Sequence, residues 1–209
     1  MTRRDLPPLA PSFYARAPAI VARELLGKRL IRHSPEGLCV GRIVETEAYL
    51  SSRDPACHAT RGMTRRNATM FGPPGRAYVY MIHARWCLNA VTEEAGLGSA
   101  VLIRAIEPLA GLELMQARRG PVPLLDLARG PARLCQALDV TKLYDGWDLT
   151  LGRELWIADD ADFSRGKYKV ARSPRIGISA AMHRLLRFFV AGSRYVSGSR
   201  FVRSTTILR

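Results

Sequence analysis

The chain contains 209 residues, and its 32 Lys and Arg against 18 Asp and Glu give a formal net charge of +14. This length is typical of one domain, and the charge excess attracts polyanions, so we expect nucleic acid to be the partner and not a membrane. No apolar run has the length of a signal peptide core or a membrane span. We therefore expect a cytoplasmic protein, or a nuclear one if the source is eukaryotic, and a monomer, because no apolar interface stripe is present.

The first eleven residues contain several prolines and charges, so we predict a flexible segment there, followed by one domain over residues 12–197. A short helix is predicted over residues 19–26, where Gly27 ends it. Alternating apolar residues and intervening turns predict five strands, over residues 28–32, 38–50, 77–83, 88–91 and 100–106. Two further helices are predicted over residues 112–118 and 131–138.

In the last quarter of the chain, a polar stretch predicts a surface loop over residues 159–173, followed by strands at 175–178 and 186–190. Residues 198–209 are interpreted as a basic, solvated tail. Strands and helices occur without regular βαβ alternation and without repeats. We therefore predict a single α+β domain in which helices surround a mostly antiparallel sheet.

Cysteines and lysines restrict the chemistry that this domain can perform. The cysteines form no Cys-x-x-Cys pair, so we expect neither a zinc site, nor a disulfide framework, nor a cofactor. They are Cys39, Cys57, Cys87 and Cys135. No lysine lies between Lys28 and Lys142, so a covalent Schiff-base intermediate is not expected near residues in that interval.

Two acids stand two positions apart in the sequence Glu-Thr-Glu-Ala-Tyr over residues 45–49. On a strand, Glu45, Glu47 and Tyr49 would share one face at intervals of about 7 Å. Repulsion between neighbouring carboxylates, together with burial, prepares one of them to act as a general base. The alternative is that both acids lie on the solvent face of a half-exposed strand.

A long loop and an aromatic strand follow these acids. Residues 51–74 are rich in arginine, which suits contacts with phosphates on either side of a bound nucleotide. In the strand over residues 77–83, alternation places Tyr78 and Tyr80 on one face and His83 on the other. Such tyrosines could stack on a flat base, or they could be ordinary core residues of a strand.

Several motifs occur in an order and spacing that resemble those of the alkyladenine (3-methyladenine) DNA glycosylase family, the type unrelated to helix-hairpin-helix glycosylases. The resemblance covers roughly residues 12–197. It is carried by ETEAY at 45–49, His58, MFGPPGRAYVY at 70–80, Asn89, VLIRAIEP at 101–108, GPARLCQAL at 130–138, SPRIGI at 173–178 and LRFFVAG at 186–192.

The resemblance implies a fold like the C-terminal domain of formyltransferases, with a curved sheet, and a monofunctional glycosylase of base excision repair. Such an enzyme flips an alkylated or deaminated purine, of the 3-methyladenine, 7-methylguanine and hypoxanthine class, out of double-stranded DNA and hydrolyses its N-glycosidic bond. In this sequence Glu47 would then activate the attacking water, Arg104 would help to hold that water, and Glu45 would be structural.

The resemblance also assigns binding roles. Tyr49 and His58 would contact the extruded base from one side and Tyr80 from the other. Asn89 would exclude the exocyclic amino group of normal guanine. Two residues suit contacts with the DNA backbone, namely Arg133 and Arg175.

One position departs from the family pattern. Mammalian members place a Tyr three residues after the base-stacking Tyr, where it fills the vacated stack, and this sequence has His83 there. An imidazole can stack, but its smaller surface should hold the extruded state less firmly, because base–aromatic stacking contributes only ~1–3 kcal/mol.

Two other functions fit parts of the sequence. A carbohydrate hydrolase could use Glu45 and Glu47 as an acid and base pair, but a neutral sugar gains little from a strongly basic surface. A non-catalytic protein that binds damaged DNA could use the same charge and aromatic residues.

Overall fold

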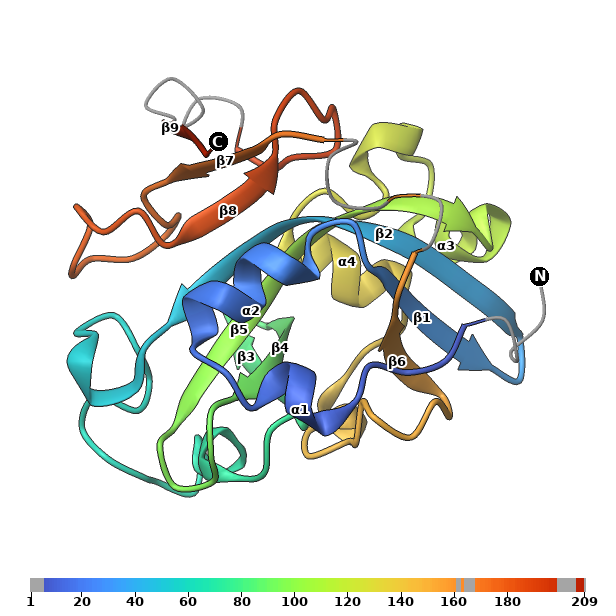
Figure 1. Cartoon of the computed structure of the whole chain (residues 1–209). Helices are drawn as coiled ribbons and strands as arrows, with labels where there is room; N and C mark the ends of the chain where they lie inside the picture. Colours follow the sequence, from blue (N-terminus) through green and yellow to red (C-terminus); the bar gives the residue numbers. More distant parts are fainter. Residues whose placement is uncertain (1–5, 161–162, 164–167, 199–205, 209) are drawn as a thin grey trace.

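The computed structural model describes residues 6–160, 163, 168–198 and 206–208. Within these residues a sheet of nine strands follows the path β3-β4-β5-β2-β8-β7-β9, and β1 and β6 extend it beside β2. All strand pairs are antiparallel. Figure 1 shows this sheet twisted, with only a few short helices around it. The predicted α+β class with a mostly antiparallel sheet is confirmed.

The described strands are β1 Arg29–Ser34, β2 Gly37–Tyr49, β3 Ala77–Ile82, β4 Arg85–Thr92, β5 Ser99–Ala110, β6 Leu155–Ala158, β7 Val170–Ser173, β8 Arg187–Val190 and β9 Thr206–Leu208. The α-helices are α1 Pro11–Tyr14, α2 Pro18–Leu25, α3 Leu112–Arg119 and α4 Pro131–Ala137. Short 3-10 turns lie at Ser51–Arg53, Ala68–Phe71, Leu124–Asp126 and Lys142–Tyr144.

Strand β2 organises the molecule because it changes neighbours along its length. On one side it pairs with β5 from Val40 to Tyr49, with irregular register around Glu45. On its other side, the first half pairs with β1, and the residues from Glu45 to Glu47 pair with β8. The two acids therefore lie in the middle of the sheet, between two long-range strand partners.

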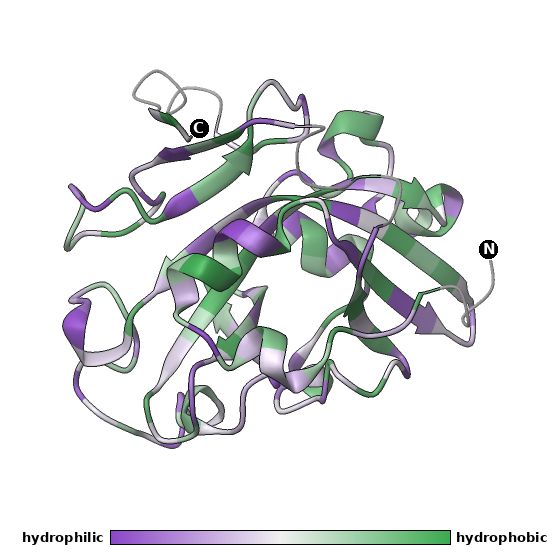
Figure 2. Cartoon of the chain, viewed as in Figure 1, coloured by the Kyte–Doolittle hydropathy of each residue, from purple (hydrophilic) through white to green (hydrophobic). Residues whose placement is uncertain are grey.

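Helix α2 covers the neighbouring strands β2 and β5 (Figure 1). The hydroxyl of Thr46 donates a hydrogen bond to the carbonyl of Ala22 in α2 at 2.8 Å. Since adjacent side chains on a strand point to opposite faces, Glu45 and Glu47 point away from this helix. Figure 2 shows β8 as hydrophobic except where it begins, and Arg187, its first residue, is fully buried.

The predicted helices and the first five predicted strands are present, with ends that differ by a few residues. The prediction of a strand at 175–178 is wrong: the strand is β7, inside the stretch predicted as a loop. Pro174 cannot donate to a strand ladder, and Gly177 has φ of 76°, so the chain leaves the sheet there. Strand β6 was not predicted, because its four residues are all buried and show no alternation.

The structure describes part of each segment predicted at the two ends of the chain. In the segment 1–11, residues 1–5 lie outside the described residues, whereas Leu6 is 4% exposed and its carbonyl accepts a hydrogen bond from Trp156 Nε1. Of the predicted tail 198–209, the structure describes residues 198 and 206–208. Residues 206–208 form β9, which pairs with β7.

Candidate active site

Glu45 is a fully satisfied buried carboxylate. Its oxygens accept hydrogen bonds from Arg104 Nε at 2.9 Å and from Arg187 Nε at 2.7 Å. The backbone N–H and the hydroxyl of Ser197 donate two more, at 2.7 and 2.9 Å. The side chain of Glu45 has 0% exposure. With four donors from three separate segments, Glu45 ties β2 to β5, to β8 and to the segment after β8.

Glu47 is equally buried but has a different set of partners. One carboxylate oxygen accepts a hydrogen bond from the Tyr49 hydroxyl at 2.9 Å, and the other accepts one from the backbone N–H of Ile176 at 2.8 Å. The Nη1 atom of Arg104 lies 3.3 Å from the same carboxylate. All three partners line one cavity, so the carboxylate is held in a fixed orientation directly behind the cavity wall.

Arg104 bridges the two acids. Burial lowers the pKa of Arg104, but the negative charges of Glu47 and Glu45 outweigh it and raise this pKa above its ordinary value. The guanidinium therefore stays charged and compensates both carboxylates. Strand β5 supplies this residue, because Arg104 belongs to β5 and β5 pairs with β2.

The cavity has a volume of about 490 Å³, within the range of about 300–1,000 Å³ usual for small-molecule sites. Tyr49, His58 and Tyr80 contribute its aromatic lining. The rings of His58 and Tyr80 meet edge to face, with centroids 4.5 Å apart, and His58 Nδ1 lies 3.0 Å from the Tyr78 hydroxyl. The predicted aromatic site residues are therefore brought together.

Tyr49 and His58 are both uncharged at neutral pH, the first because it keeps its proton and the second because it does not take one up. Partial burial of the ring lowers the pKa of His58, and the charge of Arg66 lowers it further. Burial raises the pKa of Tyr49 well above its ordinary value, with the Glu47 carboxylate adding to the shift. At neutral pH the Tyr49 hydroxyl thus keeps its proton and donates a hydrogen bond to Glu47. The His58 imidazole carries no charge.

His83 lies at the tip of the β3–β4 hairpin. The two turn residues, His83 and Ala84, have φ of 47° and 57°, as in the two-residue turns that match strand twist. Next to the tip, Met81 and Ile82 are 39% and 44% exposed. Because Ile82 and His83 also line the cavity, an exposed, partly apolar hairpin stands at its rim.

Three other predicted site residues, Asn89, Arg133 and Arg175, lie outside the cavity lining. Asn89 is buried and donates to the carbonyl of Tyr78 at 2.9 Å, and it is not among the residues that line the cavity. Arg133 is exposed on α4, where it pairs with Asp126 at 2.5 Å. The side chain of Arg175 has 0% exposure and is bound to Asp54. Because its side chain is enclosed in this way, Arg175 cannot reach a phosphate of the DNA backbone.

Several other residues that line the cavity were not predicted from the sequence. Cys87 is paired with Tyr80 in the hairpin register, so the predicted alternation could have placed it in this wall. Cys57 and the segment 176–180 also line the cavity. These carry no periodic signal, since they belong to loops whose course depends on distant contacts.

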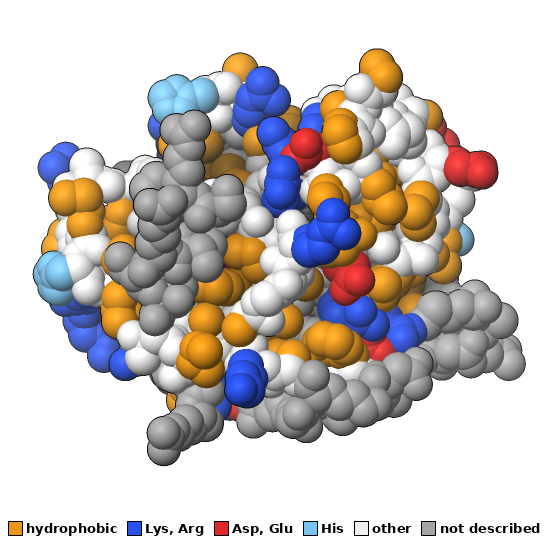
Figure 3. Space-filling model, turned by 90° about the horizontal axis from the view of Figure 1, so that it is seen from above, with side chains coloured by type: hydrophobic (Ala, Val, Ile, Leu, Met, Phe, Trp, Pro, Cys, Tyr) orange, Lys and Arg blue, Asp and Glu red, His pale blue; other side chains and the backbone are white. Residues whose placement is uncertain are grey.

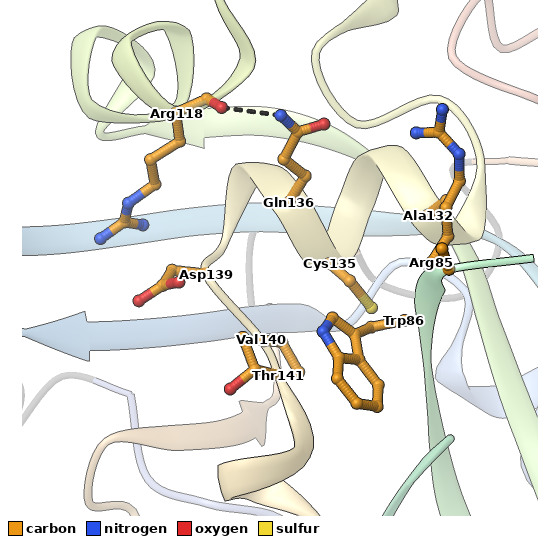
Figure 4. Close-up of a pocket in the computed structure, with 10 residues that line it drawn as sticks. Arg85, Trp86, Arg118, Ala132, Cys135, Gln136, Asp139, Val140 and Thr141 are labelled. Atoms are coloured by element: carbon orange, nitrogen blue, oxygen red, sulfur yellow. Dashed lines mark hydrogen bonds between the residues drawn. The ribbon is translucent and has the colours of Figure 1, made fainter. Parts of the chain in front are cut away.

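A second cavity, of about 470 Å³, lies between β4 and α4 (Figure 4). Trp86, Cys135 and Arg85 line it, and Asp139 is the one acid in its lining. Within the described part of the chain, no cluster of three His, Cys, Asp or Glu could hold a metal ion. None of the helices that the structure describes is long and apolar enough to cross a bilayer.

The surface charge is broadly distributed. On the face shown in Figure 3, Lys and Arg side chains are spread among hydrophobic ones. Near the cavity, the loop after β2 contributes exposed residues at 61–66, three of them arginines. Such a surface suits a polyanionic partner.

Comparison with known proteins agrees with this geometry. The family model of methylpurine-DNA glycosylase (MPG) matches residues 12–194. A protein of Mesorhizobium japonicum is 47% identical over 94% of this chain and 93% of its own length, and one of Koribacter versatilis is 46% identical over 97% and 100%. A protein of Rhodopirellula baltica is 49% identical over 91% and 83%. All three are named, provisionally, as 3-methyladenine DNA glycosylases. The chain belongs to the methylpurine-DNA glycosylase family.

Proposed function

We propose that this protein is a monofunctional DNA glycosylase that takes an alkylated or deaminated purine out of duplex DNA and hydrolyses its N-glycosidic bond. The observation that carries the proposal is the Glu47 carboxylate, held by Tyr49, Ile176 and Arg104 behind a cavity with aromatic walls. The family and the names of the relatives support a 3-methyladenine DNA glycosylase.

The cavity requires the base to leave the stack, because an aromatic pocket cannot reach a base inside a duplex. The rings of Tyr49, His58 and Tyr80, which all line the cavity, would contact the extruded base. The hairpin tip with His83 would fill the space that the base leaves in the duplex. Exposed arginines, including Arg133, would contact phosphates and fix the register.

In the reaction, the oxygen of a water molecule forms a bond with the anomeric carbon of the sugar. The N-glycosidic bond breaks, and its electron pair goes to the base nitrogen. Glu47 takes the proton of the water, and its negative charge also stabilises the oxocarbenium-like transition state. A purine alkylated on a ring nitrogen already carries a positive charge, so it leaves as a neutral molecule without further protonation. A deaminated purine such as hypoxanthine is neutral in the duplex, so it takes up one proton from solvent water as it leaves.

The lysines support hydrolysis without strand cleavage. Lys28 and Lys142 are bound to Asp159 and Asp145, and neither lines the cavity. A Schiff base with the sugar therefore has no amine among the described cavity residues. Borohydride added during the reaction should trap no covalent protein–DNA complex, and a trapped complex would refute the monofunctional assignment.

The direct test is single-turnover release of a base from duplexes that contain one hypoxanthine or one stabilised 3-methyladenine analogue. Wild type is compared with Glu47→Gln and with Glu36→Gln, which removes the same charge from a side chain that is 60% exposed. We expect release at similar rates by wild type and by Glu36→Gln, and release about 10²–10⁴-fold slower by Glu47→Gln. Damage-selective binding by a wild-type protein that releases no base would instead establish a non-catalytic DNA-binding protein.

A further inference from the structure

Asp54 and Arg175 form a fully buried ion pair beside the cavity, and the activity proposed above gives neither residue a role. Both side chains have 0% exposure. Arg175 binds Asp54 through two parallel contacts, Nη1 to Oδ2 at 2.5 Å and Nη2 to Oδ1 at 2.7 Å. This two-point geometry is rigid and directional.

The pair connects the segments that carry the site. Asp54 accepts backbone N–H groups of Leu50 and Ala56, both at 3.2 Å, and so shapes the loop that leads to His58. Arg175 donates to the carbonyl of Ala48 at 2.9 Å, next to Glu47 in β2. The residue after Arg175, Ile176, supplies the N–H that binds Glu47.

The guanidinium of Arg175 also covers one face of the Tyr49 ring, with its central carbon 4.6 Å from the ring centroid. Tyr49 lines the cavity and Arg175 does not, so the cation lies on the side of the ring away from a bound base. An unbalanced positive charge at this place would repel a base that is itself positive. Asp54 supplies the balancing negative charge.

The buried charges behind the cavity cancel as a set. The three arginines at 104, 175 and 187 face the three carboxylates of Glu45, Glu47 and Asp54. Burial raises the pKa of Asp54, but its hydrogen bonds and attraction to Arg175 outweigh this and hold the pKa below its ordinary value. Asp54 is thus an anion at neutral pH, and the balance holds under working conditions.

We propose that the Asp54–Arg175 pair sets the preference of the site between cationic and neutral damaged bases, by positioning Tyr49 and by cancelling the charge behind its ring. The two residues act through Tyr49 and are positioning residues. The proposal rests on the glycosylase function proposed above.

The sign of the charge makes the proposal testable. Asp54→Asn leaves an unbalanced cation behind Tyr49 and should disfavour a cationic base such as 7-methylguanine relative to neutral hypoxanthine. Arg175→Gln leaves an unbalanced anion and should shift the preference the opposite way. At an effective dielectric constant of about 20, a unit charge about 10 Å away changes such a ratio by roughly tenfold. The double variant Asp54→Asn with Arg175→Gln is neutral again and should return close to the wild-type ratio.

The experiment measures single-turnover release of each of the two bases by the same preparation of each variant. The quantity compared is the maximal release rate divided by the enzyme concentration at which the rate is half-maximal. The ratio between the two bases cancels differences in the folded fraction. Asp160→Asn is the matched control, because Asp160 is a buried acid paired with Arg29 and Arg42 and lies outside the cavity lining. Its ratio should equal that of the wild type.

Opposite shifts in the two single variants, with recovery in the double variant, support the proposal. Equal losses for both bases, with the ratio unchanged within about twofold, would show that the pair is only structural and would overturn it. If one single variant does not fold, the other single variant and the double variant still show in which direction the preference shifts. If wild type releases one base only, the ratio is taken from duplex affinities of the same variants in a Glu47→Gln background. If wild type releases neither base, the proposed function itself fails.

Discussion

Glu45 and Glu47 are two positions apart on the same strand, and both are fully buried, yet their surroundings differ. Glu45 accepts four hydrogen bonds from Arg104, Arg187 and Ser197. Glu47 is oriented by groups that themselves line a cavity. The cluster around Glu45 is saturated, whereas the cavity before Glu47 has room for a ligand. The hydrogen-bond partners, and not the residue type, therefore distinguish Glu47, which we propose as the catalytic base, from Glu45, to which we assign a structural role.

The sharpest way to test this difference is Glu47→Gln. The amide keeps the size of the side chain and removes the base, so release of a damaged base should fall by about 10²–10⁴-fold. Single-turnover kinetics measures the rate, and a thermal melt measures stability. We expect the melting temperature to change much less than it does for variants of Glu45. A rate within tenfold of wild type would remove Glu47 from the catalytic role.

The complementary change is Glu45→Ala. It leaves the buried guanidinium of Arg187 without its carboxylate, and loss of one partner of a buried ion pair costs about 3–5 kcal/mol. For a chain of this size the melting temperature should fall by on the order of 10 °C. Surface variant Glu36→Gln serves as the control. An unchanged melting temperature would show that the Glu45 cluster does not hold the sheet together.

Truncation of the aromatic wall should have an intermediate effect. Tyr80→Ala removes a ring that lines the cavity, and base–aromatic stacking contributes about 1–3 kcal/mol per base. We expect weaker binding of damaged duplex by about 5–150-fold, with unchanged affinity for undamaged duplex. Fluorescence anisotropy on both duplexes checks this. Tyr144→Phe, outside the cavity, is the control, and equal losses on both duplexes would contradict a base-specific role.

Substitution of His83 at the hairpin tip should change the affinity for damaged duplex less than loss of Tyr80 does. His83→Tyr enlarges the ring at an exposed turn position and should tighten binding to damaged duplex a fewfold, because stacking grows with ring area. His83→Ala should weaken the same binding. Competition titrations against labelled duplex would detect both. If neither variant changes the affinity, His83 does not enter the duplex.

The smallest expected effect concerns pH. Because His58 has a lowered pKa in the folded protein, the unfolded chain takes up this proton first as pH falls. The free energy of unfolding should therefore decrease as pH drops through the ordinary histidine value of 6.5 and level off below the folded pKa. Urea unfolding between pH 7.5 and 5 measures this, and His58→Gln should show a shallower decrease. Parallel curves for both proteins would contradict it.

Much of this architecture could be predicted because it depends on local pattern. Alternation and turn residues located β2, β3 and α4 to within a few residues. The two-residue spacing of Glu45, Glu47 and Tyr49 correctly placed them on one strand. The sequence could not distinguish solvent-facing acids from buried ones, because both follow the same alternation.

Contacts between distant segments decided the rest. Arg175 looked suited to a phosphate, but β2 and the loop at Asp54 enclose it completely. The apolar side chain of Ile176 indicates no chemical role, yet its backbone N–H orients Glu47 across 129 positions of the chain. The sequence by itself determined which residues share a strand face, since side-chain direction follows from backbone geometry. Only the tertiary structure decided which acid is saturated and which is held by residues that line a cavity, because hydrogen-bond partners and burial arise when segments far apart in the chain come together.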